Sequence, residues 1–207
     1  MQPAILDPGL ELIVGLGNPG EQYAKTRHNA GFWLLDRIAA HFNLVFRRQS
    51  RFRGDIAELI YADRKILLLK PTTYMNLSGQ SAAAAASFYR LPVDHVLVVH
   101  DDLDLPVGTA RLKRGGGHGG HNGLRDLIAA GLRDCWRLRI GIDHPGDRDD
   151  VIDYVLKNPS KPDREMIDTV LDRCMDITEL MLDGQMEKAM HSLHSKQKSE
   201  DRIQNRS

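Results

Sequence analysis

Cysteine is scarce in this sequence. Its 207 residues include two cysteines, Cys135 and Cys174, which lie 39 positions apart and share no CxxC spacing. A disulfide framework and a standard zinc knuckle both need closely spaced cysteines, so neither is expected. Free thiols suit a reducing compartment, and we predict a cytoplasmic protein.

Long apolar runs are lacking, and so is an excess of charge of either sign. No apolar run approaches the roughly 20 residues of a membrane-spanning helix. The first residues, MQPAILDPGLE, have neither the basic start nor the apolar core of a signal peptide. Lys and Arg number 28, as do Asp and Glu, and the formal net charge is +0. The chain as a whole therefore does not attract nucleic acid, and no membrane partner is expected.

Basic residues are nevertheless concentrated in two stretches. From Arg111 to Arg139, seven basic residues stand against two acidic ones, a local excess of five. A second cluster consists of Arg47, Arg48, Arg51 and Arg53. A partner that carries phosphate would have to be recognised by such a local surface.

The pattern of apolar residues predicts one α/β domain. With 42% hydrophobic and 27% charged residues, the composition is that of a globular protein. Apolar runs and alternation predict strands at 12–16, 56–60, 66–69, 96–99, 109–113 and 136–142, the last with Arg137 and Arg139 facing outward. Spacings of three and four predict helices at 30–42, 78–90 and 122–130, and two more on either side of Gly184. Because strands and helices interleave, we predict a single domain over 1–207. Its twisted mixed sheet is largely parallel and flanked by helices, with loose tails at about 1–10 and 195–207.

A glycine-rich turn follows the first predicted strand. The segment LIVGLGNPGEQYAKTRHNAG (12–31) contains Gly15, Gly17 and Gly20, and then His28. Glycine lets the backbone approach a ligand, and histidine exchanges protons near neutral pH, which together indicate an active-site loop. These glycines also satisfy GxGxxG, but a dinucleotide site needs a helix at the third glycine and an acidic residue after a second strand. Neither follows here, so the dinucleotide interpretation is disfavoured.

Three further polar segments lie at the ends of predicted strands or the start of a helix. They are TTYMN (72–76), HDDLD (100–104) and GGGHGGHNG (115–123). Ligands of open α/β sheets bind beyond the carboxyl ends of the strands, so we expect these groups to converge: Asn18, His28, Asn76, Asp101 and Asn122. A carboxylate that orients the ring of His28 explains Asp101 with few assumptions.

Two metal interpretations compete with this one. Clustered aspartates suit Mg²⁺, and His118 with His121 forms an HxxH pair. No phosphate-binding Lys-Ser/Thr loop accompanies the aspartates, and no third ligand is suggested beside the histidines. We therefore predict no metal and no cofactor.

Five segments in order resemble the bacterial-type peptidyl-tRNA hydrolases. They are LIVGLGNPGEQYAKTRHNAGF, KPTTYMNLSG, HDDLDLPVG, GGGHGGHNGLRD and RLRIGIDHPGD, which together run from Leu12 to Asp147. The helical region through about Leu193 fits as well. The resemblance implies an enzyme that cleaves the ester between a peptide and the terminal ribose of tRNA, with peptidyl-tRNA as the partner. We expect the protein to be a monomer.

The resemblance also implies a role for each matching residue. His28 would be the base that activates water, Asp101 would hold its ring, and Asn18 would position the water and stabilise the oxyanion. The peptide main chain would bind Asn76 and Asn122, and the cleft would be lined by Tyr23 and Met75. Lys113 and Arg139 would clamp the terminal phosphate of the tRNA.

Two other classes remain as alternatives. A non-catalytic RNA-binding module would use the basic faces and leave His28 incidental. A nucleotide- or metal-dependent enzyme would use the GxGxxG-like turn.

Overall fold

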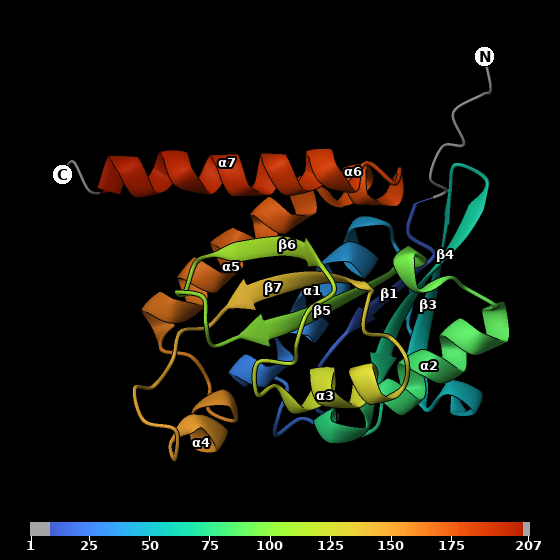
Figure 1. Cartoon of the computed structure of the whole chain (residues 1–207), viewed down its shortest axis with the longest axis horizontal. Helices are drawn as coiled ribbons and strands as arrows, with labels where there is room; N and C mark the ends of the chain where they lie inside the picture. The colour runs from blue at the N-terminus through green and yellow to red at the C-terminus, as the bar shows by residue number, and fades with distance from the viewer. Residues whose placement is uncertain (1–8, 205–207) are drawn as a thin grey trace.

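A seven-stranded sheet forms the centre of the molecule, in a computed structural model that describes residues 9–204 (Figure 1). Its strand order is β2-β3-β4-β1-β5-β7-β6. The strands are β1 (Leu12–Gly15), β2 (Arg47–Gln49), β3 (Gly54–Tyr61), β4 (Arg64–Pro71), β5 (Val96–Asp102), β6 (Ala110–Arg114) and β7 (Trp136–Gly141). The pairs β1–β4, β1–β5 and β5–β7 are parallel, and the other three are antiparallel, so β3 and β6 run against the remaining strands. The predicted α/β fold with a mixed, largely parallel sheet is confirmed.

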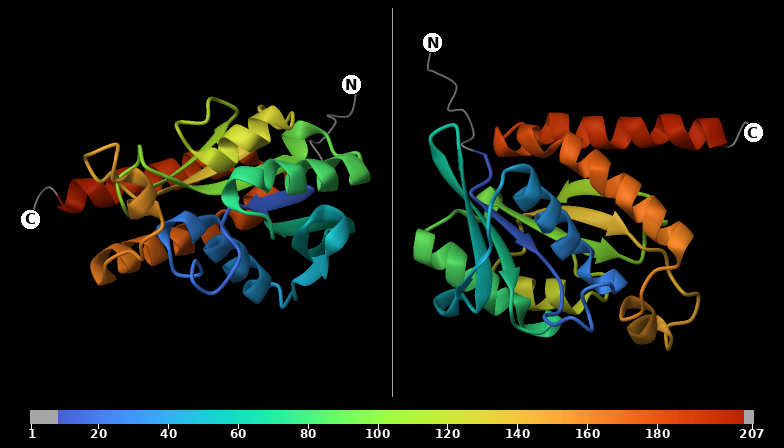
Figure 2. Two further views of the ribbon diagram at one scale, coloured as in Figure 1. Left: turned by 90° about the horizontal axis from the view of Figure 1, so that it is seen from below. Right: turned by 180° about the vertical axis from the view of Figure 1, so that it is seen from behind.

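Helices cover both faces of this sheet (Figure 2). They are α1 (Ala30–His41), α2 (Ser78–Tyr89), α3 (Asn122–Ala129), α4 (Val151–Val155), α5 (Lys161–Asp176), α6 (Thr178–Leu182) and α7 (Met186–Gln204). Short 3₁₀ turns lie at η1 (Arg27–Asn29), η2 (Ser50–Phe52), η3 (Met75–Leu77) and η4 (Val93–His95). Because side chains alternate along a strand, Leu12 and Val14 pack into the core under α2 and α3, while Ile13 packs into the core with α1 and α5.

The alternation and helical spacing located most of the long elements, but β2 and α4 were missed, and α5 and α6 were predicted as one helix. β2 has the sequence RRQ and is fully exposed, so it carries no apolar signal. α4 has five residues, too few for a helical period to be recognised. Residues 195–204, predicted as a loose tail, continue α7, and Leu10 is buried. The rest of the predicted tails, 1–8 and 205–207, lies outside the described residues.

The register of the central strands brings three loops to one edge of the sheet. Gly15 at the end of β1 is paired with Val99 of β5, and Val14 is paired with Leu69 of β4. All three strands run in parallel, so the segments that follow them leave at the same edge. No described helix is long and apolar enough to cross a membrane.

Candidate functional site

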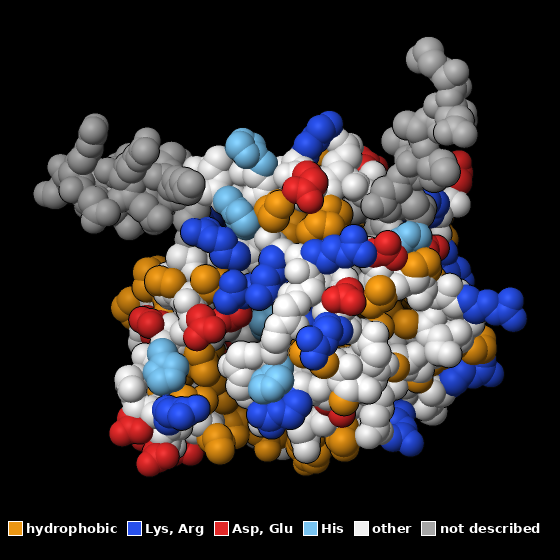
Figure 3. Space-filling model, in the orientation of Figure 1, with side chains coloured by type: hydrophobic (Ala, Val, Ile, Leu, Met, Phe, Trp, Pro, Cys, Tyr) orange, Lys and Arg blue, Asp and Glu red, His pale blue; other side chains and the backbone are white. Residues whose placement is uncertain are grey.

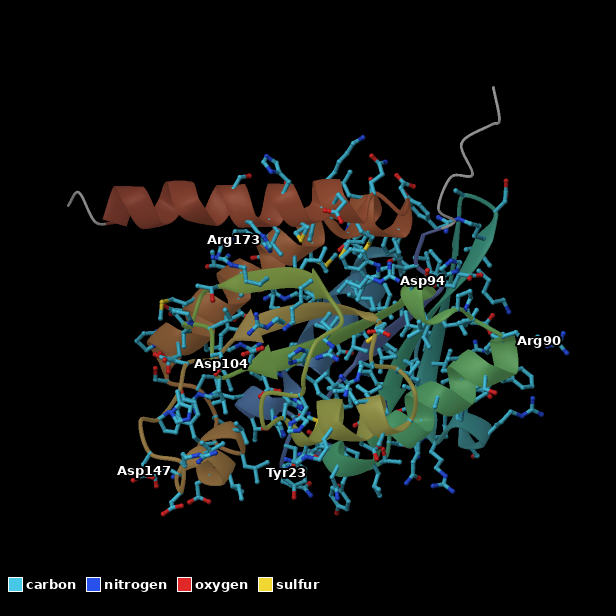
Figure 4. The ribbon with its side chains drawn as sticks, viewed as in Figure 1. Tyr23, Arg90, Asp94, Asp104, Asp147 and Arg173 are labelled. Atoms are coloured by element: carbon cyan, nitrogen blue, oxygen red, sulfur yellow. The ribbon has the colours of Figure 1, made fainter. Side chains whose placement is uncertain are left out.

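The loops at this edge surround a cleft of about 970 Å³. Its walls come from the loop after β1, from η3, from the end of β5, from the glycine loop before α3, and from α4. Every site residue predicted from the sequence lines it: Asn18, Tyr23, His28, Met75, Asn76, Asp101, Lys113, Asn122 and Arg139. In Figure 4, Tyr23 and Asp104 mark two different sides of this region.

His28 and Asp101 form a buried pair in the cleft. Nδ1 of His28 lies 3.0 Å from each carboxylate oxygen of Asp101. A carboxylate only accepts hydrogen bonds, so Nδ1 carries a proton, and in the neutral ring Nε2 keeps its lone pair. The pairing of β1 with β5 explains why these two side chains are close. His28 lies in η1, directly before α1, and Asp101 lies two residues beyond the partner of Gly15 on β5.

A second imidazole, that of His121, holds the same carboxylate. Nε2 of His121 lies 3.0 Å from Oδ1 of Asp101. Its Nδ1 accepts the backbone N–H groups of Gly123 and Leu124, at 3.1 and 3.3 Å, and thereby caps α3. Because Nδ1 is an acceptor, Nε2 must carry the proton that is donated to Asp101. The HxxH spacing of His118 and His121 did not predict this contact, which joins residues 20 positions apart.

The protonation equilibria reflect this arrangement. Burial alone would lower the pKa of His28, but the charge of Asp101 and its hydrogen bond outweigh burial and raise it above its ordinary value of 6.5. Burial alone would raise the pKa of Asp101, whereas the imidazoles of His28 and His121 hold it well below its usual range. The carboxylate is thus ionised, and it favours a proton on His28.

His100, next to Asp101 on β5, is held neutral. It is 2% exposed, and burial with the nearby His121 lowers its pKa to about 3. Its Nδ1 donates to the carbonyl of Asp101 at 2.6 Å. Its Nε2 is buried and has no hydrogen-bond partner among the described residues. A neutral ring at this position adds no positive charge to the cleft.

The amide of Asn18 is oriented by the backbone around it. Its Oδ1 accepts the N–H of Met75 at 2.8 Å, so its Nδ2 is the end left toward the cleft. Asn29 fixes the backbone of Asn18 with two hydrogen bonds, from the N–H of Asn18 at 2.9 Å and to its carbonyl at 3.0 Å. Asn18 therefore presents a fixed donor to the cleft that contains His28.

The other predicted contact residues lie along the walls. Asn76 and Asn122 are exposed, and Oδ1 of Asn122 accepts from Arg125 at 2.9 Å. The ring of Tyr23 contacts that of Tyr74 edge to face, with centroids 6.5 Å apart, and Met75, the residue after Tyr74, is buried. This wall combines amides with apolar and aromatic surface.

A helix that was not predicted from the sequence, α4, forms another wall of the cleft. α4 contributes Val151 and Val155 to the cleft. Buried Arg27, next to His28, donates to the carbonyls of Lys157 and Asn158 at 3.3 and 3.1 Å, just beyond α4. Arg27 therefore ties the position of this wall to that of the histidine.

Basic side chains gather over β6 and β7 (Figure 3), where the cleft continues. Lys113 and Arg139 both line it, and Nε of Arg139 donates to Asp102 at 2.6 Å. Burial and the neighbouring guanidinium groups of Arg139 and Arg137 lower the pKa of Lys113. Positive charges held this close attract an anion.

Arg137 was predicted to face outward, and this was wrong. It is 1% exposed, and its guanidinium donates to the carbonyls of Gly116, Gly117 and Arg133 at 2.9, 2.6 and 3.1 Å. Alternation placed Arg137 on the correct face of β7, but the glycine loop covers that face. Its charge serves to hold this loop over the sheet.

The glycine turn after β1 also differs from the expectation. A Cβ on Gly15 would meet the carbonyl oxygen of Gly31 at 2.6 Å, and one on Gly17 would meet the ring of Phe32 at 2.7 Å. The absence of a Cβ at Gly15 and Gly17 therefore lets the first residues of α1 pack closely against this turn, and it does not make room for a ligand. The chain from Leu16 to Thr26 forms no helix, which removes the structural context that a dinucleotide site needs.

One group of residues has the composition of a metal site. The ligand atoms of His28, Asp101 and His121 lie within 4.8 Å of one another, and His118 is not part of the group. In this arrangement two N–H···O bonds to Asp101 already join the three side chains. A bound ion would have to replace both of these protons, so the geometry fits a hydrogen-bonded triad better than a metal centre.

Comparison with known proteins gives a consistent result. Residues 12–201 match the family model described as peptidyl-tRNA hydrolase. The chain is 52% identical to a peptidyl-tRNA hydrolase of Haemophilus influenzae (strain 86-028NP) over 90% of this chain and 97% of that protein. It is 49% identical to one of Methylobacillus flagellatus over 92% and 99%. A crystal structure of peptidyl-tRNA hydrolase from Acinetobacter baumannii superposes with a TM-score of 0.88 at 40% identity, covering 90% of this chain and 95% of that one.

Proposed function

The chain belongs to the peptidyl-tRNA hydrolase family, and on this premise we propose that it hydrolyses the ester joining a peptide to the terminal ribose of tRNA. The His28–Asp101 pair in the cleft is the observation that carries this proposal. Hydrolysis of an ester by water needs a proton acceptor and a donor for the oxyanion, and the cleft holds both. Peptidyl-tRNA supplies the ester and the phosphates that the basic surface would bind.

His28 is the base in this mechanism. With the proton on Nδ1, its Nε2 takes a proton from water as the water attacks the ester carbonyl. Asp101 holds the ring in this tautomer and stabilises the imidazolium that forms. The proton then passes from Nε2 to the ribose oxygen that leaves, and the base returns to its starting state.

Asn18 stabilises the tetrahedral intermediate. Its Nδ2 is a fixed donor because the N–H of Met75 occupies Oδ1. One such donor contributes roughly 2.7–4 kcal/mol to transition-state stabilisation. Asn76 and Asn122 bind the peptide main chain, and Tyr23 and Met75 line the cleft beside it. Amide groups recognise backbone without regard to side chains, which suits a substrate of arbitrary peptide sequence.

Lys113 and Arg139 clamp the terminal phosphate of the tRNA. Asp102 holds Nε of Arg139, which leaves the other guanidinium nitrogens for a phosphate. We propose that the protein acts as a monomer and as a single hydrolase domain. Its proposed place of action is the cytoplasm, where peptidyl-tRNA is released from ribosomes.

The purified protein should release free peptide and tRNA from a defined peptidyl-tRNA. The proposed mechanism uses protein side chains alone, so release should persist in EDTA without added nucleotide. Binding without release of peptide would favour the RNA-binding module. Loss of activity with chelator and its recovery with a transition metal would favour a metal enzyme at His28, Asp101 and His121.

Arg139→Ala is expected to weaken binding of peptidyl-tRNA and to flatten its salt dependence. Each phosphate contact adds roughly 0.7–0.9 to the slope of log K against log salt concentration, so the slope should fall by about that amount. Binding isotherms at a series of salt concentrations measure it. Lys188→Ala, an exposed lysine on α7, is the matched control and should keep the wild-type slope. An unchanged slope for Arg139→Ala would contradict the clamp.

A further inference from the structure

A second basic surface lies at the opposite edge of the sheet from the clamp. We call it the arginine–aromatic surface; it comprises Arg47, Arg48, Arg51, Arg53, Phe52, Phe88 and Tyr89, from β2, η2, the residue after η2, and the end of α2. A groove of about 620 Å³ runs between η2 and the end of α2. The proposed hydrolysis mechanism uses none of these residues.

Aromatic rings and guanidinium groups are interleaved in this surface. Phe88 is 52% exposed, and the guanidinium carbon of Arg51 lies 4.5 Å from the centroid of its ring. The Phe88 ring also contacts Phe52 and Tyr89, with centroids 5.4 and 4.9 Å apart. A large apolar ring held in the open beside cations is suited to bind a partner with both apolar and anionic groups.

The local charge is positive even after ion pairs are considered. Asp55 lies 2.6 Å from Nε of Arg48, and Glu58 lies 3.1 Å from Lys65. The nearby carboxylates are thus engaged by two cations, while Arg47, Arg51 and Arg53 are exposed. Arg53 donates to the neutral side chain of Gln80 at 2.6 Å. The surface therefore presents an excess of positive charge to an acidic ligand.

This surface is continuous with the wall of the cleft. The carbonyl of Arg53 accepts the N–H of Thr72 at 2.8 Å, and the segment after Thr72 provides Tyr74 and Asn76 to the cleft. From there α2 runs along the rim of the molecule to Arg90, which is labelled at its far end in Figure 4. A chain that leaves the cleft past Asn76 meets Arg53 first and Phe88 afterwards.

From this continuity we infer that the arginine–aromatic surface binds the peptide part of the substrate, and that it favours acidic side chains several residues away from the ester. The inference rests on the proposed hydrolysis of peptidyl-tRNA. β2 and β6 occupy opposite ends of the strand order, roughly 25–30 Å apart at the usual strand spacing. A tRNA held by Lys113 and Arg139 occupies the β6 side, so the peptide is the part of the substrate that extends toward β2.

The distances set which peptide residues reach this surface. At 1.5 Å per residue, Gln80 lies roughly 6 Å beyond Asn76 along the chain, and Phe88 a further 12 Å or so. An extended peptide advances about 3.3 Å per residue, so five or six residues span this path. Acidic residues roughly four to eight positions from the ester should therefore contact the arginines, and a dipeptide should not.

Three peptidyl-tRNAs with the same tRNA test the inference. One carries a dipeptide, and two carry ten-residue peptides with either three Asp or three Asn at positions four to eight from the ester. The wild-type protein should hydrolyse the acidic substrate with a kcat/KM about threefold to tenfold above that of its Asn counterpart, as expected for two or three exposed ion pairs. The double variant R51Q/R53Q should lose this preference and hydrolyse the dipeptide substrate as the wild type does. Lys188→Gln, at an exposed lysine on α7, removes a charge of the same sign without freeing Asp55 or Glu58, and it should keep the preference.

Several outcomes would overturn the inference. Equal rates of the wild type on the two ten-residue substrates would show that the surface does not bind acidic peptide. A loss of affinity of R51Q/R53Q for deacylated tRNA, as large as its loss on the acidic substrate, would assign the surface to RNA. No hydrolysis of any of the three substrates by the wild type would instead refute the proposed function itself. Thermal unfolding of each variant confirms that its fold is retained.

Discussion

His28→Ala should lower the single-turnover rate of peptidyl-tRNA hydrolysis by about 10²–10⁴-fold, the usual contribution of a positioned base. Asn18, Lys113 and Arg139 remain in place, so affinity for the substrate should change by less than about threefold, roughly 0.6 kcal/mol. The lost base cannot be replaced by the neighbouring imidazole, because Nδ1 of His121 caps α3 and its Nε2 faces Asp101. Quenched-flow measurement of free peptide, with enzyme in excess, gives the rate directly.

His41→Ala is the control for this experiment. His41 is an exposed histidine at the end of α1, far from the hydrogen bonds of the cleft, and its replacement should leave the rate unchanged. Hydrolysis by His28→Ala within about fivefold of the wild type would be incompatible with His28 as the base, given the usual contribution of such a group. A large increase in the dissociation constant would show that His28 binds substrate rather than activating water.

Asp101→Asn should lower the single-turnover rate by a similar factor, and the hydrogen bonds of Asp101 explain why. The carboxylate accepts from two imidazoles, whereas an amide has one oxygen and one NH₂ group. His121 must donate from Nε2, because its Nδ1 accepts from Gly123 and Leu124, and it therefore takes the oxygen of the substituted amide. The NH₂ group then faces Nδ1 of His28 and forces the proton onto Nε2. The nitrogen that should accept a proton from water becomes a donor, and we expect the rate to fall about 10²–10⁴-fold.

The double variant D101N/H121S tests this explanation. Serine is a good N-cap residue, so α3 keeps its cap, while the Nε2–H of His121 is removed. The amide is then free to turn its oxygen toward His28, and the rate should rise at least about tenfold above that of Asp101→Asn, because the base regains its working tautomer. The absence of any recovery would contradict the tautomer argument. Asp63→Asn, an exposed aspartate in the turn between β3 and β4, should behave as the wild type.

The pH dependence of the rate carries a second signature of the same pair. As the proposed base, His28 would act in its neutral form, so the wild-type rate should fall as the pH drops through the raised pKa of His28, above its ordinary value of 6.5. Burial opposes that increase, and the charge and hydrogen bond of Asp101 cause it. In Asp101→Asn the acid limb of the remaining activity should therefore move to lower pH. An acid limb at the wild-type position would show that Asp101 does not set the pKa of His28.

Particular residues show how far sequence reasoning reached. His28 and Asp101 could be paired in advance because one follows a predicted strand and the other lies at the carboxyl end of a second strand, and these ends share one edge of the sheet. The contact of His121 with Asp101 could not be predicted, because an HxxH pair in a glycine-rich loop does not indicate that one ring points inward and caps the following helix. The prediction that Arg137 is exposed was wrong because alternation along β7 indicates which face of the sheet a side chain lies on, but not what covers that face.

The sequence by itself determined the types and order of most elements, the family resemblance and the residues able to carry the chemistry. These follow from local periodicity and from segments that are contiguous in the chain. Only the tertiary structure decided that one carboxylate serves two imidazoles, that Arg137 holds a loop, and that Gly15 and Gly17 admit α1 rather than a ligand. The physical reason is that tautomers, buried charges and close backbone approaches depend on partners far apart in sequence, which only packing brings within hydrogen-bond distance.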